Sequence, residues 1–392
     1  MKLVLFCHPA FLKSQSMPRF AKMIGESMQA KGHDVAYWSP QPYFHCLAAE
    51  TRWEKWAGYV DQYVIFPLVV KWRASSTSAD TLFVFCDQAL GPWVPLVKRR
   101  PHVVHAHDLL ALRSALGLIP QNPTGFTGRI YQRYIRWGFR QAKRFIAVSK
   151  RTRSDLAEFA DVDPLTTTVV YNGLNFPYQQ VPADLARQTL QQAGMPVPAQ
   201  GMLLHVGGDQ WYKNTAGIIR MYAEYATRET SPLPLWMVGP APRRQDVIDA
   251  VAAVPPAGRI EFFQGVDNLA LQAAYSVAKA FLFPSLAEGF GWPIVEAQAC
   301  GCPVITTDDA PMNEIGGSLA YYLPLLQPQQ DVCAWAKHAA SILISALHAE
   351  GDAGGPQRAQ ARVEWASQFA NQQVIDSYEK LYLDIKGEFV AV

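Results

Sequence analysis

Residues 281–317 read FLFPSLAEGFGWPIVEAQACGCPVITTDDAPMNEIGG, and this stretch decides how the rest of the chain is interpreted. The apolar run that it opens with ends at Pro284, which is typical of a buried parallel strand leaving its sheet. Glu288 then lies in the loop after that strand. Gly289 and Gly291 let backbone N–H groups come close to a ligand, and Pro293 suits the first position of a helix.

A second carboxylate, Glu296, follows eight residues after Glu288, in the first turn of that helix. Between the two lie backbone N–H groups and the positive end of a helix dipole, which bind phosphate. A sugar nucleotide needs this combination, because its hydroxyls donate to carboxylates and its diphosphate accepts from N–H groups and a cation. Each glutamate alone has a plainer interpretation, as a solvated loop acid or a helix-start acid. The whole arrangement favours a ligand site.

The stretch resembles the donor-site signature of retaining GT-B glycosyltransferases of the family 4 group, in which two glutamates flank a glycine-rich turn. The resemblance implies that Glu288 contacts hydroxyls of the donor hexose and that Glu296 contacts the ribose. It places the backbone of Gly289, Phe290 and Gly291 against the sugar or phosphate. It also implies an α/β fold of the GT-B type, with two doubly wound Rossmann-like domains facing each other across a cleft.

The composition agrees with two domains and an anionic partner. A chain of 392 residues exceeds the usual size of one domain, and at 49% hydrophobic residues it can bury large cores. Residues 1–180 hold 22 Lys and Arg against 12 Asp and Glu, which gives +10, whereas residues 181–392 hold 13 against 21, which gives −8. A membrane surface or lipid phosphate suits the basic half as well as nucleic acid does. No nucleic-acid recognition motif accompanies the charge, so no such partner is expected.

Cysteine usage and hydropathy indicate the compartment. The six cysteines are scattered without metal-ligand spacing, so no metal site and a reducing environment are expected. Cys300 and Cys302 are interpreted as buried small residues at a helix-to-strand turn. No apolar run reaches the roughly 18 to 20 residues needed to span a bilayer, and the first residues are too few for a signal peptide. A cytoplasmic protein is expected, with at most peripheral contact with the inner face of the membrane.

The first domain is predicted to span residues 1–180 and to open with a strand, a helix and a second strand, as in a doubly wound sheet. The loop after the first strand, HPAFLKSQSMP, has no glycine, so the dinucleotide-binding fingerprint is absent. In the resembled family this loop often carries two adjacent glycines and reaches the donor phosphates and the acceptor. Ser14, Gln15 and Ser16 stand in that place here, which puts that contact in doubt.

Another apolar strand of the first domain, residues 102–106, leads into HAHDLLAL. Ligands of open α/β sheets bind at the carboxyl ends of strands. In similar enzymes the second histidine of such a run, here His107, meets the donor sugar across the cleft. His107 therefore joins Glu288 and Lys213 as an expected catalytic residue. Asp108 is interpreted more plainly, as a helix N-cap.

Two further features of the first domain leave alternatives open. Residues 40–80 are rich in aromatic rings, which would form either an acceptor-binding lobe or the core of an inserted helical pair. These rings belong to Trp53, Trp56, Tyr59, Tyr63, Phe66 and Trp72. A helix over residues 128–143 would carry a basic face, suited to anionic lipid or a pyrophosphate-linked acceptor, or would simply be solvated. Its basic residues are Arg129, Arg133, Arg136, Arg140 and Lys143.

The second domain is predicted to span residues 200–366, after a linker at 181–199, and a final helix at about 367–392 is expected to return to the first domain. The first strand of the second domain leads to Gly207 and Gly208, and Lys213 follows at a helix start. A lysine there opposes the helix dipole unless an anion lies between them.

The resemblance makes Lys213 the lysine that binds the diphosphate beside Gly207 and Gly208. Gly208 stands where an arginine is usual, so one cation is missing or is supplied by Arg243 or Arg244. The backbone near Val266 is expected to hold the nucleobase. Asp267 or Asn268 could then distinguish guanine from uracil.

These features predict a metal-independent, retaining transferase. It would move a hexosyl group from a UDP- or GDP-sugar to a glycan or lipid-linked acceptor in cell-surface polysaccharide assembly, without a further cofactor. No DxD-like acidic pair marks a metal site, and Lys213 with the helix amides would stabilise the departing diphosphate. The alternatives are a nucleotide-sugar-binding protein that transfers nothing and a GT-B epimerase or phosphorylase.

Overall fold

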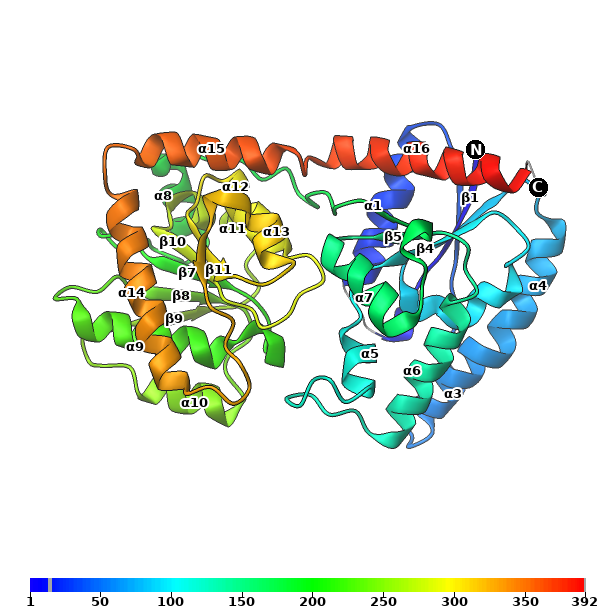
Figure 1. Ribbon diagram of the computed structural model, residues 1–392, viewed down its shortest axis with the longest axis horizontal. Helices are drawn as coiled ribbons and strands as arrows, with labels where there is room; N and C mark the ends of the chain where they lie inside the picture. Colours follow the sequence, from blue (N-terminus) through cyan, green and yellow to red (C-terminus); the bar gives the residue numbers. More distant parts are fainter. Residues whose placement is uncertain (13–15, 391–392) are drawn as a thin grey trace. The chain divides into compact units, whose positions relative to one another are not determined.

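The computed structural model describes residues 1–12 and 16–390 of the protein (Figure 1). The chain forms two compact units, one made of Met1–Asn175 with Gln372–Val392 and the other of Phe176–Asn371. The segment 181–199, predicted to be a linker with a short helix, contains α8 (Ala183–Gln192). This helix packs against α11 (Asn268–Val277), because its buried Ala186 and Leu190 need a partner, and it therefore belongs to the second unit.

The first unit is built on a six-stranded parallel sheet with the strand order β2-β1-β3-β4-β5-β6. Its strands are β1 (Lys2–Phe6), β2 (Asp34–Trp38), β3 (Leu82–Phe85), β4 (His102–Ala106), β5 (Phe145–Ala147) and β6 (Thr167–Val169). Apart from β2 and β6 they are almost entirely buried, because helices cover both faces of the sheet. The strand order reverses between β1 and β3, so the carboxyl ends of these two strands border the crevice where such sheets bind ligands.

Helices from both ends of the chain cover one face of this sheet. There α1 (Ser16–Ala30) and α16 (Asn371–Val390) bury Phe20, Ile24, Tyr378 and Tyr382. Salt bridges fasten α16 to the same unit, since Lys31 Nζ lies 2.6 Å from Asp376 and 2.7 Å from Glu379. The final helix predicted at about 367–392 begins at Asn371, because α15 (Gly355–Ser367) precedes it and ends at Ser367.

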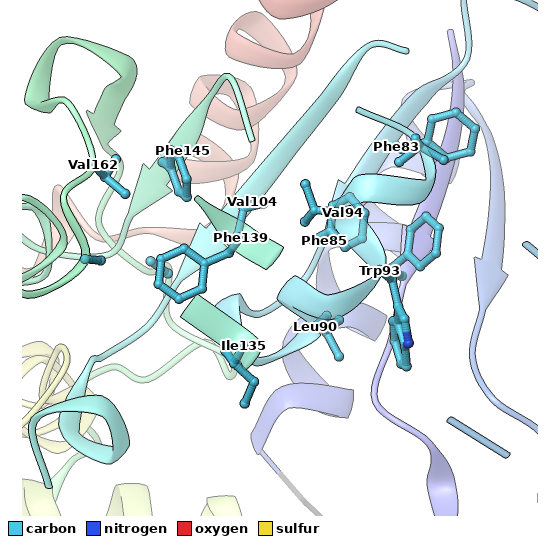
Figure 2. Close-up of a cluster of buried hydrophobic side chains, with 14 of the residues drawn as sticks. Phe83, Phe85, Leu90, Trp93, Val94, Val104, Ile135, Phe139, Phe145 and Val162 are labelled. Atoms are coloured by element: carbon cyan, nitrogen blue, oxygen red, sulfur yellow. The ribbon is translucent and has the colours of Figure 1, made fainter. Parts of the chain in front are cut away.

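The opposite face of the first sheet carries the aromatic core drawn in Figure 2. The 3-10 segment η3 (Gln88–Leu96) and α6 (Phe126–Phe139) pack closely there, and a Cβ on Gly138 would lie 2.2 Å from the carbonyl oxygen of Gly91. Phe139 and Phe145 meet edge to face in this core, with 6.3 Å between ring centroids. The shorter α5 (Leu110–Ala115) and α7 (Lys150–Ala160) complete the unit.

One long helix spans residues 54–76. The sequence had left open whether an inserted pair of helices lies in this region. The long helix consists of α3 (Glu54–Val60), the π-helical turn η2 (Asp61–Ile65) and α4 (Phe66–Ser76), preceded by the short α2 (Tyr43–Leu47). Phe66 packs into the core, whereas Trp53, Trp56 and Trp72 are exposed. The aromatic residues of this segment are therefore divided between core and surface.

The second unit has another six-stranded parallel sheet, with the order β12-β11-β10-β7-β8-β9. Its strands are β7 (Leu203–Val206), β8 (Leu235–Val238), β9 (Ile260–Phe263), β10 (Ala280–Phe283), β11 (Val304–Thr307) and β12 (Tyr321–Leu323). Counted from β7, this is the 3-2-1-4-5-6 order of dinucleotide-binding sheets. The switch point lies between β7 and β10, the two strands that precede Lys213 and Glu288.

Helices on both faces cover this sheet. The core on one face joins α9 (Thr215–Arg228) to α14 (Val332–Glu350) through residues such as Met221, Tyr222 and Trp335. Two shorter helices, α10 (Gln245–Ala252) and α13 (Met312–Gly316), flank the strands. Arg362 of α15 is buried and lies 2.8 Å from Glu350, so an ion pair links α14 to α15.

Candidate donor site

The first part of the candidate site follows β7. A Cβ at Gly207 would lie 2.7 Å from Nε2 of the buried His205, so any larger residue would have to displace that imidazole. The chain then makes a 3-10 turn, η5 (Trp211–Lys213), and Asn214 adopts a left-handed conformation with φ of 54° before α9 begins. Lys213 therefore lies in the turn two residues before α9, close to the helix start predicted for it.

The second part of the site follows β10 and is tied to the first by hydrogen bonds. The Asn214 side chain donates to the carbonyl of Pro284 at 3.0 Å, and the backbone N–H of Leu286 donates to the carbonyl of Tyr212 at 2.7 Å. From β11, the hydroxyl of Thr307 donates to the carbonyl of Ser285 at 2.7 Å. These bonds hold the two loops side by side at the switch point.

Lys213 and Glu288 meet directly as a result. The ammonium of Lys213 lies 2.7 Å from Oε1 of Glu288, and the two side chains are only 14% and 10% exposed. The ammonium also lies 4.8 Å from the ring centroid of Phe283. An ammonium has three N–H donors, so Lys213 can bind a phosphate oxygen while it keeps its bond to Glu288.

Glu296 lies deeper than the sequence suggested. Its helix, α12 (Trp292–Ala299), begins after Gly291, which has a φ of 101° that favours glycine, and Pro293 takes the second rather than the first helical position. Glu296 is therefore beyond the first turn and is buried, where it accepts a hydrogen bond of 3.1 Å from the Tyr275 hydroxyl. This burial raises the pKa of Glu296 to about 7, against the opposing effects of Tyr275 and Lys213.

A small hollow lies at the carboxyl ends of β7 and β8. Its lining includes Gly207, Gly208, Thr215, Val238, Gly239 and Pro240. Two polar atoms that line it are buried without a hydrogen-bond partner in the described structure, Nε2 of His205 and Oγ1 of Thr215. Such orphaned atoms are uncommon in protein interiors, and a polar ligand in the hollow would satisfy them.

The structure also places the other residues expected to contact the nucleotide. Val266 is half-buried in the loop between β9 and α11. Asp267, however, caps α11 by accepting a 2.8 Å hydrogen bond from the N–H of Ala270, so its carboxylate is already engaged. Arg244 pairs with Asp246, whereas Arg243 is exposed.

His107, in the first unit, is buried at the end of β4. Its Nε2 lies 3.0 Å from the carbonyl oxygen of Cys86, and the edge of the Phe20 ring packs on it with 4.5 Å between centroids. Burial lowers the pKa of His107, so the imidazole is neutral and donates from Nε2 to that carbonyl. Asp108 accepts from the N–H of Leu110 at 2.9 Å, but it lies one residue before the N-cap of α5, which is Leu109 rather than the predicted Asp108.

The basic helix begins and ends earlier than predicted, since α6 stops at Phe139. Arg136 and Arg140 both pair with Asp161, with 3.4 Å between Arg140 and the carboxylate. Lys143 lies outside the helix with its ammonium 4.6 Å from the ring centroid of Phe389. The predicted stripe of five cations is thus shorter and partly neutralised, and Arg133 remains exposed on it.

A second pair of side chains, which was not predicted from the sequence, lies at the switch point of the first sheet. His8 follows β1 and Asp87 follows β3, and His8 Nε2 lies 2.8 Å from the Asp87 carboxylate. Both side chains are largely buried. The signal was a polar residue two positions after each of two apolar strands. Residues 14 and 15 of the nearby loop, which bear on the contact with donor and acceptor, lie outside the described part of the chain.

The described residues hold neither a metal-binding cluster nor a membrane-spanning helix. They contain no group of three or more His, Cys, Asp or Glu side chains that could hold a metal ion. In the same residues, no helix combines the length and the apolar character needed to cross a bilayer. All six cysteines are free thiols.

Comparison with known proteins identifies the family. Residues 17–176 match the model of the Glycosyltransferase Family 4, and residues 188–343 match that of the Glycosyl transferases group 1. Together these matches cover both units. The chain belongs to the family 4 group of glycosyltransferases and has their GT-B fold of two Rossmann-like domains.

Individual relatives are more distant. The D-inositol 3-phosphate glycosyltransferase of Salinispora tropica is 28% identical over 267 residues, which are 64% of this chain and 52% of that protein. The O-antigen chain mannosyltransferase B of Escherichia coli is 30% identical over 140 residues, 36% of each chain. The chain thus spans about half or less of these relatives. The solved structure of Anabaena HepE in complex with UDP and glucose shares the fold, with a TM-score of 0.68, 18% identity and coverage of 98% of this chain and 100% of that one.

Proposed function

We propose that the protein is a retaining glycosyltransferase that moves a hexosyl group from a UDP- or GDP-sugar to a glycan or lipid-linked acceptor in cell-surface polysaccharide assembly. One observation carries the proposal: Lys213 and Glu288, from the loops after β7 and β10, form a buried 2.7 Å pair at the switch point of the second sheet. Ligands of such sheets bind there. A cation and a carboxylate side by side suit a ligand that carries both phosphates and hydroxyls.

Each residue of the donor site has a proposed role. Lys213 would use its two remaining N–H donors for the diphosphate, while Glu288 accepts from hydroxyls of the hexose. Glu296 would accept from the ribose hydroxyls, and the backbone around Val266 would contact the base. Gly207, Gly208 and the backbone of residues 289–291 would approach the phosphates and the sugar, because glycine leaves room for a close ligand.

The proposed reaction is the one that the resemblance to the family implies. The bond between the anomeric carbon and the phosphate oxygen breaks, and the acceptor oxygen bonds to that carbon on the same face. The acceptor proton passes to the departing phosphate, so no protein base is required. Lys213 stabilises the negative charge that develops on the diphosphate, which is the role that a metal ion has in other transferases. A buried ammonium already in place needs little reorganisation during the reaction.

The acceptor is proposed to bind the first unit. His107 would reach the donor sugar from this unit. Its neutral imidazole, which donates from Nε2 to Cys86, offers Nδ1 as an acceptor. Arg133, Arg136 and Arg140 would attract an anionic acceptor or membrane surface, although Asp161 offsets part of their charge. The six free thiols support a reducing compartment, and we place the enzyme on the cytoplasmic side of the membrane.

Two alternative functions are distinguished by their products. A nucleotide-sugar-binding protein without transferase activity is favoured by Gly208, which stands where the resembled family carries an arginine. Such a protein would bind the donor and release no nucleoside diphosphate. An epimerase or phosphorylase would convert the nucleotide sugar, or a glycan with phosphate, with no sugar acceptor added.

The proposal is tested first by the thermal stability of the chain with a panel of nucleotides and sugar nucleotides. A ligand that binds only the native state raises the melting temperature, by an amount that grows with its concentration over Kd. We expect UDP or GDP and one of the corresponding sugars to raise it, and adenine nucleotides to have no effect. If no uridine or guanosine nucleotide stabilises the chain at millimolar concentration, the proposed function is wrong.

A further inference from the structure

Exposed apolar side chains are distributed very unevenly between the two units, although these are equal in length. Of the large apolar residues that are exposed in the described chain, only Leu185, Ile248 and Leu269 lie in the second unit. Most of the others lie on α2, on the long helix of residues 54–76 and on α6. Single exposed apolar residues are ordinary on a soluble surface, but a contiguous concentration marks a binding surface.

The long helix carries a straight apolar row on its outer side. Trp56, Val60, Val64, Leu68 and Trp72 follow at intervals of four, and all are exposed, Leu68 by 61% and Trp72 by 74%. In an ordinary α-helix, residues spaced by four would drift slowly around the helix axis, because the helix has 3.6 residues per turn. The π-helical turn at Asp61–Ile65 takes one extra residue, so it keeps the two halves of the row on the outer side.

The charges beside this row are basic. Lys55, Lys71 and Arg73 are exposed along it. The only two acids of the helix do not oppose them: Asp61 is buried and accepts hydrogen bonds of 2.9 and 2.8 Å from backbone N–H groups of α2, and Glu54 lies 3.3 Å from His45. An apolar face with a tryptophan near each end and lysine and arginine beside it is the pattern of a helix that lies in a membrane interface.

Aromatic contacts extend this surface onto α6. The hydroxyls of Tyr63 and Tyr131 lie 2.6 Å apart, and the rings of Tyr63 and Tyr134 meet with 5.6 Å between centroids. Tyr134 stacks on Trp137 at 5.9 Å, and both are exposed. These contacts place α6 alongside the long helix, and Figure 1 shows α3, α4 and α6 as neighbours in the first unit.

We propose that the outer side of residues 53–76 is a membrane-binding surface that inserts its apolar row into the headgroup region of an anionic bilayer. This proposal rests on the proposed function, which included a peripheral contact with the membrane. It assigns that contact to the insertion of this helix rather than to the arginines of α6 alone. The bilayer supplies both components that the surface requires, an apolar layer for the row and negative headgroups for the cations. The first unit, where the acceptor is proposed to bind, would thereby lie against the surface that presents lipid-linked acceptors.

The test is flotation of the full chain with vesicles of phosphatidylcholine containing about one third phosphatidylglycerol, compared with pure phosphatidylcholine. The wild-type chain should float with the anionic vesicles and stay partly bound when salt is raised to about 0.5 M, because salt screens charges but not apolar contacts. The variant Val64→Asp/Leu68→Asp should lose at least about tenfold in partition coefficient, since two carboxylates would enter the apolar layer. The control Leu185→Asp changes an equally exposed leucine on α8 and should float like wild type.

Three outcomes would overturn the proposal. Equal flotation of Val64→Asp/Leu68→Asp and wild type would show that the row does not insert. Complete release by salt would show adsorption through charge alone. If light scattering found a wild-type dimer that the variant disrupts while neither floats, the row would be an interface between two copies of the chain. Nucleotide-induced stabilisation of the variant checks the donor site separately, so failure here is distinguishable from failure of the proposed function.

Discussion

Replacement of Glu296 by glutamine offers the sharpest test of the donor site, because burial gives this carboxyl a pKa of about 7 and its protonation changes in an accessible range. The ribose hydroxyls need an ionised carboxylate that accepts two hydrogen bonds. At pH 8 about nine tenths of a group with that pKa is ionised, and at pH 6 about one tenth. Since only the ionised form is competent, the apparent affinity for a nucleotide sugar should fall roughly tenfold between pH 8 and pH 6.

The stability of the ligand-free chain should change in the opposite direction. The carboxyl ionises near its usual 4.5 when unfolded and near 7 when folded, so the native state binds more protons between these values. The stabilisation that the native state gains from this carboxyl is fully present below pH 4.5 and is lost as the pH rises through 7. The free energy of unfolding changes by about 3 kcal/mol at most. Glu296→Gln removes the titration, so its unfolding free energy should be less dependent on pH over this window.

Calorimetric titration with UDP-glucose and GDP-mannose between pH 6 and 8 measures the affinity, and urea unfolding without ligand measures the stability. Sugar nucleotides are preferable to free diphosphates, whose terminal phosphate titrates near 6. Wild type should bind more weakly at pH 6, whereas Glu296→Gln should bind weakly at every pH. If wild type and Glu296→Gln show the same pH dependence of affinity, Glu296 does not contact the ribose as proposed.

Three further predictions concern other parts of the structure. His8→Asn removes an imidazole that is paired with a buried carboxylate at the switch point of the first sheet. Transfer of the sugar to the acceptor should fall at least about tenfold in a radiolabel assay, while the donor affinity measured by calorimetry stays unchanged. A parallel loss of donor affinity would contradict a role of His8 on the acceptor side. Glu350→Ala leaves Arg362 buried without its carboxylate and should cost about 3 to 5 kcal/mol in urea unfolding; a loss below about 1 kcal/mol would refute that. Gly207→Ala forces a Cβ against the buried imidazole below it and should cost about 1 to 3 kcal/mol, whereas Gly208→Ala meets only a flexible exposed side chain; equal costs would reject the steric argument.

The sequence predicted the sheets well because their signal is local. Short apolar runs bounded by turn residues located strands such as β4 and β10 at their observed bounds. The GT-B class followed from the resemblance of the donor motif. The exits of β7 and β10 were both recognised, and the structure brings their Lys213 and Glu288 together. That convergence depends on the order of strands in the sheet, which no local pattern contains.

Other features could not be predicted because they depend on distant residues. The burial of Glu296 is set by packing against Tyr275 on another helix. The partial neutralisation of the arginines on α6 depends on Asp161, which follows α7. The pairing of His8 with Asp87 joins loops far apart in the chain. Periodicity identifies the exposed or buried side of a helix, but not the partner that a given side chain meets.

The central claim is that Lys213 and Glu288 act on one activated sugar, and a double-mutant cycle of nucleoside diphosphate release measures it most directly. Each single change, Lys213→Ala or Glu288→Ala, should abolish turnover, and the double variant should lose little more than either, because the two residues act as a unit. The double variant leaves no unpaired buried charge, so it also reports whether the fold survives. Full activity in either single variant with a native unfolding profile would contradict the account.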